Sequence, residues 1–175
     1  GVIPAVFLSY EEYCKETENR MVEALFVSAG IGAVIAENAS IAGASGGCQA
    51  EIGSASAMAA GGLAYLQGGD AECIANAAAF ALKNMLGLTC DPVCGLVEVP
   101  CIKRNSAGAV NAAVSAQMAM AGIKSAIPAD EVVDSMRRIG NALPAALRET
   151  SEGGLAVTES ARKIAERMGK KENIA

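Results

Sequence analysis

The chain has 175 residues, which fits one domain with a sizeable buried core. Hydrophobic residues make up 52% of the sequence but aromatic residues only 3%, so the core must be filled by Ala, Val, Ile, Leu and Met. The net charge of −5, with Lys and Arg scattered along the chain, excludes the basic stripe that nucleic-acid binding requires.

The sequence contains six cysteines and no histidine. Six cysteines would suit three disulfides in a small secreted protein, but we find no signal peptide and the chain is longer than such scaffolds. We therefore expect free thiols and a cytoplasmic location. Without histidine, any metal must be held by thiolates or carboxylates, and any imidazole base must come from another chain or segment.

The sequence predicts helices from near its beginning. Residues 1–8 are apolar and predict an extended entry. Ser9 and Glu12 have the spacing of a capping box, which predicts that the first helix starts there. We expect this helix to continue until a break near Gly30 or Gly32, because glycine weakens a helix interior.

The longest apolar run is Ala24–Ala36, which lies between two glutamates. Because a bilayer span needs about 20 residues, this run is too short and predicts a buried core helix with no membrane partner. A loop of small residues, 38–47, follows and leads directly into Cys48.

Residues 49–66 show helical periodicity and contain two consecutive glycines, Gly61 and Gly62. Each glycine costs about 1 kcal/mol relative to Ala in a helix interior. We expect close crossing with another helix to offset that cost. The apolar positions that share one face are Ile52, Ala55, Ala59, Leu63 and Leu66.

Helix-ending signals divide the rest of the sequence. Asp70 is expected to cap a helix over 71–86 that Gly87 closes, and a further small-residue helix over 105–121 is expected to end at Gly122.

Pro128 is expected to open a helix that continues, kinked, past Pro144, and Thr158 is expected to cap a final helix that reaches Met168. No strand pattern, repeat or linker is found. We predict an all-α fold, with residues 1–175 as a single compact domain of closely packed Ala- and Gly-rich helices with cysteine-bearing loops.

The segment Thr89–Asn105 carries Cys90, Cys94 and Cys101. Its prolines exclude a continuous helix, so these thiols lie on a loop of restricted backbone. The spacing between Cys90 and Cys101 is not that of a zinc finger. Soft thiolates without histidine suit zinc or an iron–sulfur cluster. The alternative, that the cysteines are small buried hydrophobic residues, stays open for this loop.

The same alternative is favoured for Cys14 and Cys73, which lie within predicted helices. Cys48 follows two glycines, and it therefore joins the loop cysteines as a candidate ligand.

Several unusual motifs run in order along nearly the whole chain. They are Asn38-Ala-Ser-Ile, Gly46-Gly-Cys-Gln-Ala-Glu-Ile-Gly, Cys90-Asp-Pro-Val, Gly95-Leu-Val-Glu-Val-Pro-Cys-Ile, Arg104-Asn, Arg148-Glu-Thr-Ser and Gly153-Gly-Leu-Ala. With these motifs the sequence resembles the alpha region of iron–sulfur-dependent L-serine dehydratases of the two-subunit type, in which alpha and beta are separate chains.

The resemblance implies a [4Fe–4S] cluster held by Cys48, Cys90 and Cys101. Its fourth iron, without a protein thiolate during turnover, would act as a Lewis acid on the hydroxyl of L-serine. Elimination would give aminoacrylate, which hydrolyses to pyruvate and ammonia without pyridoxal phosphate. Two alternatives are a related cluster-dependent lyase acting on L-cysteine and a structural zinc protein that serves as a helical interaction module.

The resemblance also implies parts that this sequence does not include: a Thr-Pro-Thr-Ala-Gly-Ser-like loop upstream and a histidine-bearing beta subunit. We therefore expect residues 1–175 alone to be inactive, and the general base stays unidentified. A homo-oligomer is also compatible with the sequence. The candidate substrate-binding residues, all in motif loops, are Ser45, Gln49, Arg104, Asn105, Thr150 and Ser151.

Two departures from the family pattern stand out. Cys94 occupies a position where the family usually has a small residue, so it is either a simple replacement or a fourth thiolate or disulfide partner. Some single-chain relatives end in a cysteine that caps the open iron, whereas this sequence ends Glu172-Asn-Ile-Ala175 and predicts no such cap.

Overall fold

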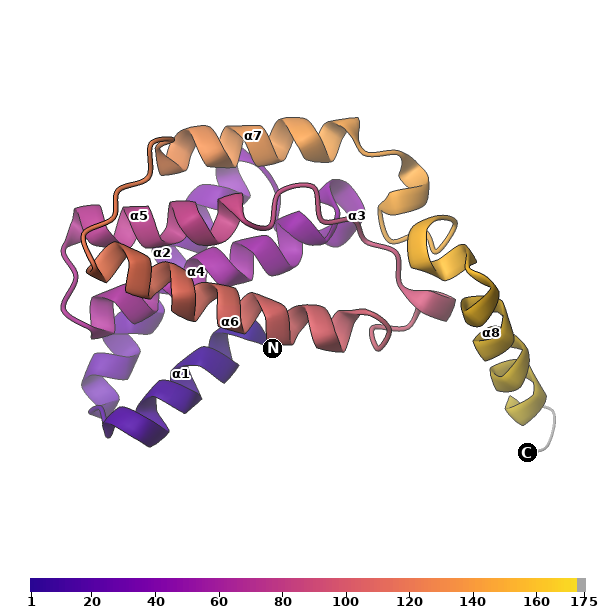
Figure 1. Ribbon diagram of the computed structural model, residues 1–175, viewed down its shortest axis with the longest axis horizontal. Helices are drawn as coiled ribbons and strands as arrows, with labels where there is room; N and C mark the ends of the chain where they lie inside the picture. Colours follow the sequence, from indigo (N-terminus) through magenta and orange to yellow (C-terminus); the bar gives the residue numbers. More distant parts are fainter. Residues whose placement is uncertain (173–175) are drawn as a thin grey trace.

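In the computed structural model the described residues are 1–172, with side chains described as far as residue 169. Residues 173–175, which belong to the predicted uncapped end, lie outside this range. Within it the chain is helical and contains no β-strand, so the predicted all-α fold is confirmed (Figure 1). The elements are α1 Val2–Cys14, α2 Glu18–Asn38, α3 Gly43–Gly46, the π-helical turn η1 Gln49–Gly53, α4 Ser54–Leu66, α5 Ala71–Lys83, the 3₁₀ turn η2 Val93–Gly95, α6 Cys101–Met120, α7 Ala129–Ala142, the 3₁₀ turns η3 Ala145–Leu147 and η4 Gly154–Val157, and α8 Glu159–Glu172.

Helix α4 is the centre of the fold, because α1, α2, α5 and α6 all pack against it. Its Gly61 and Gly62 are buried. A Cβ at Gly62 would lie 2.5 Å from the Ser28 hydroxyl and 3.0 Å from the Ala24 carbonyl oxygen of α2. A Cβ at Gly61 would collide with the side chain of Ile31, which also belongs to α2. The predicted close crossing is therefore confirmed, and both glycines are there because no side chain fits.

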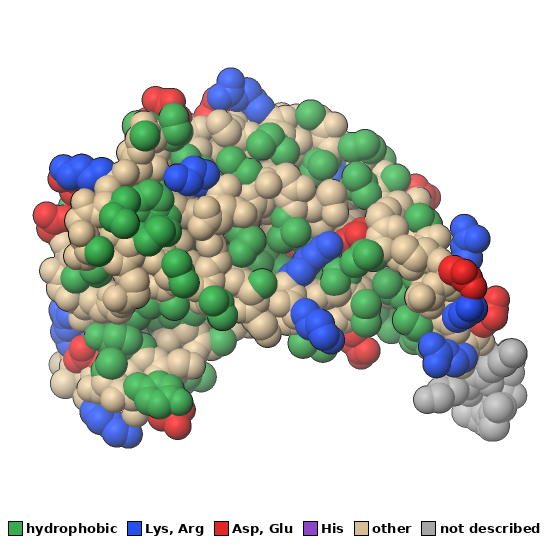
Figure 2. Space-filling view, viewed as in Figure 1, with side chains coloured by type: hydrophobic (Ala, Val, Ile, Leu, Met, Phe, Trp, Pro, Cys, Tyr) green, Lys and Arg blue, Asp and Glu red, His purple; other side chains and the backbone are tan. Residues whose placement is uncertain are grey.

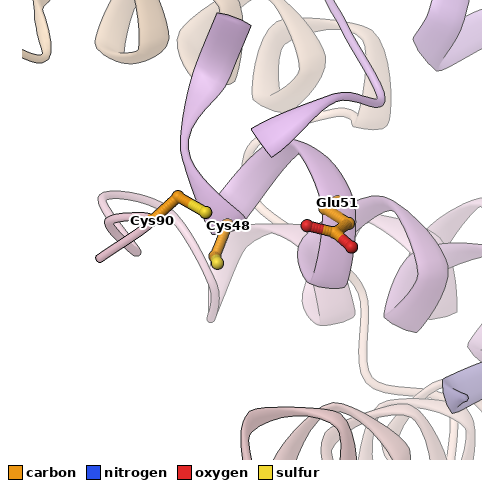
Figure 3. Close-up of side chains that lie close together, drawn as sticks. All are labelled: Cys48, Glu51 and Cys90. Atoms are coloured by element: carbon orange, nitrogen blue, oxygen red, sulfur yellow. The ribbon is translucent and has the colours of Figure 1, made fainter. Parts of the chain in front are cut away.

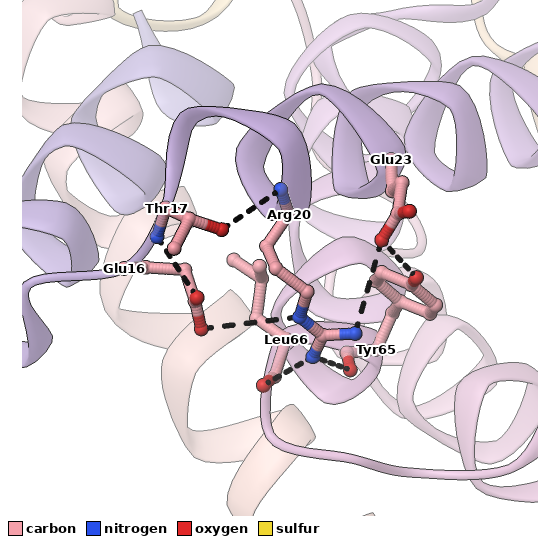
Figure 4. A network of polar contacts seen from close by, with 6 residues as sticks. All are labelled: Glu16, Thr17, Arg20, Glu23, Tyr65 and Leu66. Carbon is pink, nitrogen blue, oxygen red and sulfur yellow. Dashed lines mark hydrogen bonds and ion pairs between the residues drawn. The ribbon is translucent and has the colours of Figure 1, made fainter.

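An arginine fixes the beginning of α2 against the end of α4 (Figure 4). The Arg20 guanidinium donates hydrogen bonds to the carbonyl oxygens of Tyr65 (3.3 Å) and Leu66 (3.0 Å), and it lies over the Tyr65 ring at 4.7 Å. These carbonyls belong to the last turn of α4, where no intrahelical donor is available. The cation also complements the negative end of the helix dipole.

The chain begins differently from the sequence prediction. Helix α1 starts at Val2, not at Ser9, and the predicted extended entry is wrong. Pro4 is tolerated because it lies in the first helical turn, where backbone N–H groups have no intrahelical acceptor. Burial of apolar side chains, including Val2 and Phe7, outweighs the capping signal at Ser9.

Helix α2 runs through Gly30 and Gly32 without the predicted break. Its buried residues repeat along one face, and a Cβ at Gly32 would lie only 2.6 Å from the Met58 methyl group of α4. By length and composition α2 could cross a membrane, yet only 22% of its most apolar window is buried within the chain. The prediction that Ala24–Ala36 is a short, buried core helix is therefore wrong, because this run is part of the longer helix α2, which packs on one side.

The later helices mostly begin at their predicted caps, but α5 ends at Lys83 and not at Gly87 as predicted. Asp70 caps α5 by accepting a hydrogen bond from the Cys73 N–H (2.8 Å), and Thr158 caps α8 in the same way through the Ala161 N–H (3.3 Å). Helix α7 ends at Ala142, so the predicted kinked helix past Pro144 is wrong. The reason is that a residue before proline is driven into extended backbone.

Two loops gather at the end of the molecule beside α3: the segment that leads into α6 and the segment that follows α7 (Figure 1). Helix α8 extends away from the body and contacts η2 and η4. Apolar side chains are spread over the face in Figure 2, and charged side chains lie along its upper and left edges and along α8, with a few near the middle of the face. We call the part of the molecule formed by residues 84–100 and 143–158 beside α3 the loop end.

Candidate metal centre

Three cysteines from different parts of the chain meet at the loop end. Cys48 lies between α3 and η1, Cys90 precedes η2, and Cys101 is the first residue of α6, four residues earlier than the predicted start of that helix. All three are buried, with exposed fractions of 1%, 3% and 6%. None of the six cysteines, all within the described residues, forms a disulfide.

The closest potential ligands are the thiols of Cys48 and Cys90 and the carboxylate of Glu51, whose ligand atoms all lie within 4.8 Å of one another. Figure 3 shows the Cys90 thiol beside Cys48 and the Glu51 carboxylate facing the pair. Cys101 is not in this compact group but is close enough to Cys48 to interact with it electrostatically. A set of soft thiolates with one carboxylate and no imidazole fits iron–sulfur or zinc chemistry.

The surroundings of the three thiols favour the protonated form when no cation is present. Burial is the largest effect, and it raises the pKa of Cys48, Cys90 and Cys101 alike. For Cys90 and Cys101 the proximity of Cys48 raises the pKa further, because two thiolates repel each other. A bound metal cation reverses this balance by stabilising the thiolates, so metal binding must release protons.

The backbone around Cys48 is held from both sides. Gly47 has a φ of 77°, and a Cβ on it would lie 2.8 Å from the Leu88 carbonyl oxygen. On the other side, the buried Gln49 amide donates to the Met136 carbonyl (3.0 Å) and accepts from the Gly87 N–H (2.9 Å). Cys48 is therefore fixed relative to α7 and to the turn after α5.

Cys90 is held by backbone pairing with the loop after α7. Its N–H donates to the Leu147 carbonyl (2.9 Å), and its carbonyl accepts from the Glu149 N–H (2.8 Å). Two residues further along, the Ser151 hydroxyl donates to the Pro92 carbonyl (2.6 Å). These contacts join segments almost sixty residues apart in sequence, as the Ser151–Pro92 separation of 59 shows.

An ion pair between a buried carboxylate and a partly buried guanidinium lies beside Cys48. Arg104 Nη1 donates to Asp91 Oδ1 (2.6 Å) and to the Thr89 carbonyl (2.8 Å), and it lies 3.9 Å from Cys48 Sγ. Burial alone would lower the pKa of Arg104, but the hydrogen bond and charge of Asp91 outweigh it and raise that pKa. The second Asp91 oxygen accepts from the Leu155 N–H (2.7 Å). This pair links the two loops and directs a positive charge at the thiol.

Each predicted substrate-binding residue forms hydrogen bonds within the chain. Gln49, Arg104 and Ser151 make the contacts described above. Thr150 donates to the Ala145 carbonyl (3.0 Å) and Asn105 to the Cys101 carbonyl (3.0 Å). Ser45 lies on α3 and its hydroxyl is 2.9 Å from that of Ser40. The contacts of Gln49, Arg104 and Ser151 therefore hold distant segments together around the thiols, whereas those of Thr150, Asn105 and Ser45 are local.

Two carboxylates near the thiols were not singled out by the sequence analysis. Glu51 follows Cys48 by three residues, a spacing that puts both on one face of a helical turn and could have identified it. Glu149 has left-handed backbone, with a φ of 68°, and its proximity to Cys90 depends on the long-range loop pairing. Cys94 is exposed at the tip of its loop and is not in the compact ligand group.

The family model and the relatives that match this chain all belong to the serine dehydratases. Residues 1–156 match the model of the serine dehydratase alpha chain. The chain is 53% identical over 168 residues to a probable L-serine dehydratase alpha chain of Bacillus subtilis, covering 96% of this chain and 56% of that protein. It is 46% identical over 164 residues to the L-serine dehydratase alpha chain of Peptoniphilus asaccharolyticus, covering 94% and 56%. For L-serine dehydratase TdcG of Escherichia coli the identity is 45% over 159 residues, covering 90% and 35%. The chain thus spans about half, or less, of the length of these relatives.

Proposed function

Because the chain belongs to the serine dehydratase alpha chain family, we propose that it is the metal-binding part of an enzyme that deaminates L-serine to pyruvate and ammonia. The observation that carries this proposal is the convergence of three buried thiols, Cys48, Cys90 and Cys101, at one end of a helical scaffold. Relatives named L-serine dehydratase over most of this chain support the substrate.

The cofactor in this proposal is a [4Fe–4S] cluster held by those three cysteines. When bound, it would supply a Lewis acid for the serine hydroxyl, making hydroxide a viable leaving group. The reaction removes the α-proton and the hydroxide of L-serine, together one water, and leaves 2-aminoacrylate. The imine tautomer of this product then takes up one water to give pyruvate and ammonia.

The residues of this chain prepare the site for that chemistry. The Asp91–Arg104 pair keeps a cation beside Cys48 and so favours its thiolate. Gln49 and the loop after α7 hold the ligand-bearing backbone in place, which keeps the thiols buried and restricts the access of water. Since Arg104 is already paired, we assign recognition of the substrate carboxylate to parts of the enzyme outside this chain.

Those parts are proposed to include a beta subunit that provides the histidine this sequence lacks. The fraction of each relative that the chain covers, 56% or 35%, supports a larger functional unit. We propose a cytoplasmic enzyme without a nucleic-acid partner, in keeping with the net charge of −5, and expect residues 1–175 alone to be inactive.

The test is anaerobic iron loading of the complete enzyme, followed by assays of pyruvate formation from L-serine with L-cysteine as comparator. We expect visible iron–sulfur absorption, and pyruvate from L-serine in preference to L-cysteine. A colourless protein that binds zinc and makes no pyruvate would overturn the proposal, and preference for L-cysteine would replace its substrate.

Substitution of the ligands sharpens the test. Cys48→Ser, Cys90→Ser and Cys101→Ser are each expected to abolish iron retention and turnover, because three thiolates are needed to hold the cluster. Cys14→Ser is the matched control, since this exposed cysteine on α1 is remote in the fold. Retention of iron by all three ligand variants would contradict the assignment.

A further inference from the structure

The carboxylate of Glu51 is positioned like a ligand. Cys48 is the N-cap of η1 and Glu51 lies within η1, and one oxygen of Glu51 lies within 4.8 Å of both the Cys48 and Cys90 sulfur atoms. The backbone of α3 closes over the same space: a Cβ at Gly43 would lie 3.1 Å from Cys90 Sγ and 3.1 Å from Glu51 Oε2. Glycine at position 43 therefore leaves room for the thiol and the carboxylate to approach each other.

The Glu51 side chain is exposed, and it lies beside two buried thiols. Among the side chains described, up to residue 169, no ion pair neutralises Glu51. Arg104, the cation closest to Cys48, is paired with Asp91. Two sulfur atoms and one carboxylate oxygen within 4.8 Å of one another are donors that a single metal centre can bind.

We propose that Glu51 is the fourth protein donor of the metal centre, a carboxylate oxygen that occupies the metal position not reached by Cys48, Cys90 and Cys101. The proposal rests on the function proposed above and concerns the same site. A hard oxygen ligand binds iron less tightly than a soft thiolate does. Glu51 can therefore protect the position in the absence of substrate and give way to the serine hydroxyl.

Glu149 is the competing carboxylate. Its Oε2 lies 3.6 Å from the Cβ position of Gly43, but it does not belong to the group of ligand atoms within 4.8 Å. It is also carried by a residue with left-handed backbone in a loop, whereas Glu51 is on a turn continuous with α4. A donor on a regular element is held more precisely than one on a loop.

The experiment uses the complete enzyme, loaded anaerobically with iron enriched for Mössbauer spectroscopy. In the substrate-free wild type we expect one iron site distinct from the three thiolate-bound sites, and a shift of that site when L-serine is added. Glu51→Gln should change the distinct site before substrate is added. Glu98→Gln, which removes an exposed carboxylate from the cysteine loop, should leave it unchanged. A Glu51→Gln spectrum identical to that of the wild type overturns the proposal.

Glu51→Cys provides a test in the opposite direction. A thiolate at this position should make all four iron sites alike, slow the loss of the cluster in air and prevent L-serine from shifting the spectrum. If L-serine still shifts the spectrum of Glu51→Cys as it does that of the wild type, Glu51 is not the donor.

Cobalt(II) bound to the iron-free enzyme separates failure of this inference from failure of the proposed function. If the wild type makes no pyruvate, the proposed function fails, yet the visible absorption of cobalt still reports its donors. A shift of that absorption in Glu51→Gln but not in Glu98→Gln supports Glu51 as a ligand, and unchanged absorption in both overturns it.

Discussion

The crossing of α2 with α4 and the thiol-bearing loop end use small residues for different purposes. At the crossing, Gly61 and Gly62 remove side chains so that two helices touch. At the loop end, glycines such as Gly47 permit unusual backbone, while buried polar groups such as Gln49 and Asp91 bond to backbone atoms of distant segments. The stability of the first region should therefore depend on volume, and that of the second on hydrogen bonds and charge.

The largest expected effect comes from breaking the loop end alone. Asp91→Ala removes the partner of Arg104 and the acceptor of the Leu155 N–H, and the exposed fractions of the Asp91 and Arg104 side chains are only 4% and 18%. Removing one partner of a fully buried pair costs about 3–5 kcal/mol, and this figure is an upper bound here because 18% of the Arg104 side chain is exposed. We expect this loss in the free energy of unfolding measured with urea, together with loss of iron.

The control for Asp91→Ala is Asp134→Ala, which breaks exposed ion pairs with Arg137 and Arg138 on α7. Exposed pairs contribute about 0–1 kcal/mol, so this variant should unfold almost like the wild type and keep its iron. Equal losses in the two variants would show that charge at the loop end has no special role.

The next effect isolates the helix crossing. Gly62→Ala forces a Cβ against the Ser28 hydroxyl and the Ala24 carbonyl, and such overpacking costs about 1–3 kcal/mol. Gly30→Ala is the matched variant on α2, where a Cβ would meet nothing within 4 Å. Because Ala is a better helix former, Gly30→Ala should instead stabilise the chain by about 0.5–1 kcal/mol.

The two glycine variants are compared by urea unfolding and by iron content. Because Gly62 is at the helix crossing and not among the thiols, Gly62→Ala should lower the free energy of unfolding while the folded fraction still binds iron. Destabilisation by Gly30→Ala, or stabilisation by Gly62→Ala, would contradict the packing account.

The sequence predicted features that depend on local chemistry. The Asp70 and Thr158 caps and the close approach at Gly61 and Gly62 follow from side-chain size and hydrogen-bonding capacity, and all were found. Pro144 also marks the end of α7, because proline disfavours helical backbone at the residue before it. The sequence prediction treated this proline as a kink within a longer helix.

Features that depend on distant segments were not predicted. The start of α1 is decided by burial of Val2 and Phe7 against the core, which no local cap reveals. The Asp91–Arg104 pair and the pairing of Cys90 with residues 147–149 arise only once two loops meet, and they leave no periodic pattern. Cys48, Cys90 and Cys101 were proposed as ligands through the family resemblance, because their spacing alone left several metals open.

The smallest expected effect concerns Cys94, which lies in the cysteine loop but outside the compact ligand group. Its side chain is exposed and its φ is 57°. Cys94→Ser should therefore change the free energy of unfolding by less than about 0.5 kcal/mol and leave iron content and turnover unchanged. Cys94→Gly removes the penalty of left-handed backbone, about 1–2 kcal/mol, and adds chain entropy of similar size, so it too should be nearly neutral. A marked loss of iron in both variants would make Cys94 a ligand and would extend the metal centre from the buried thiols to the loop tip.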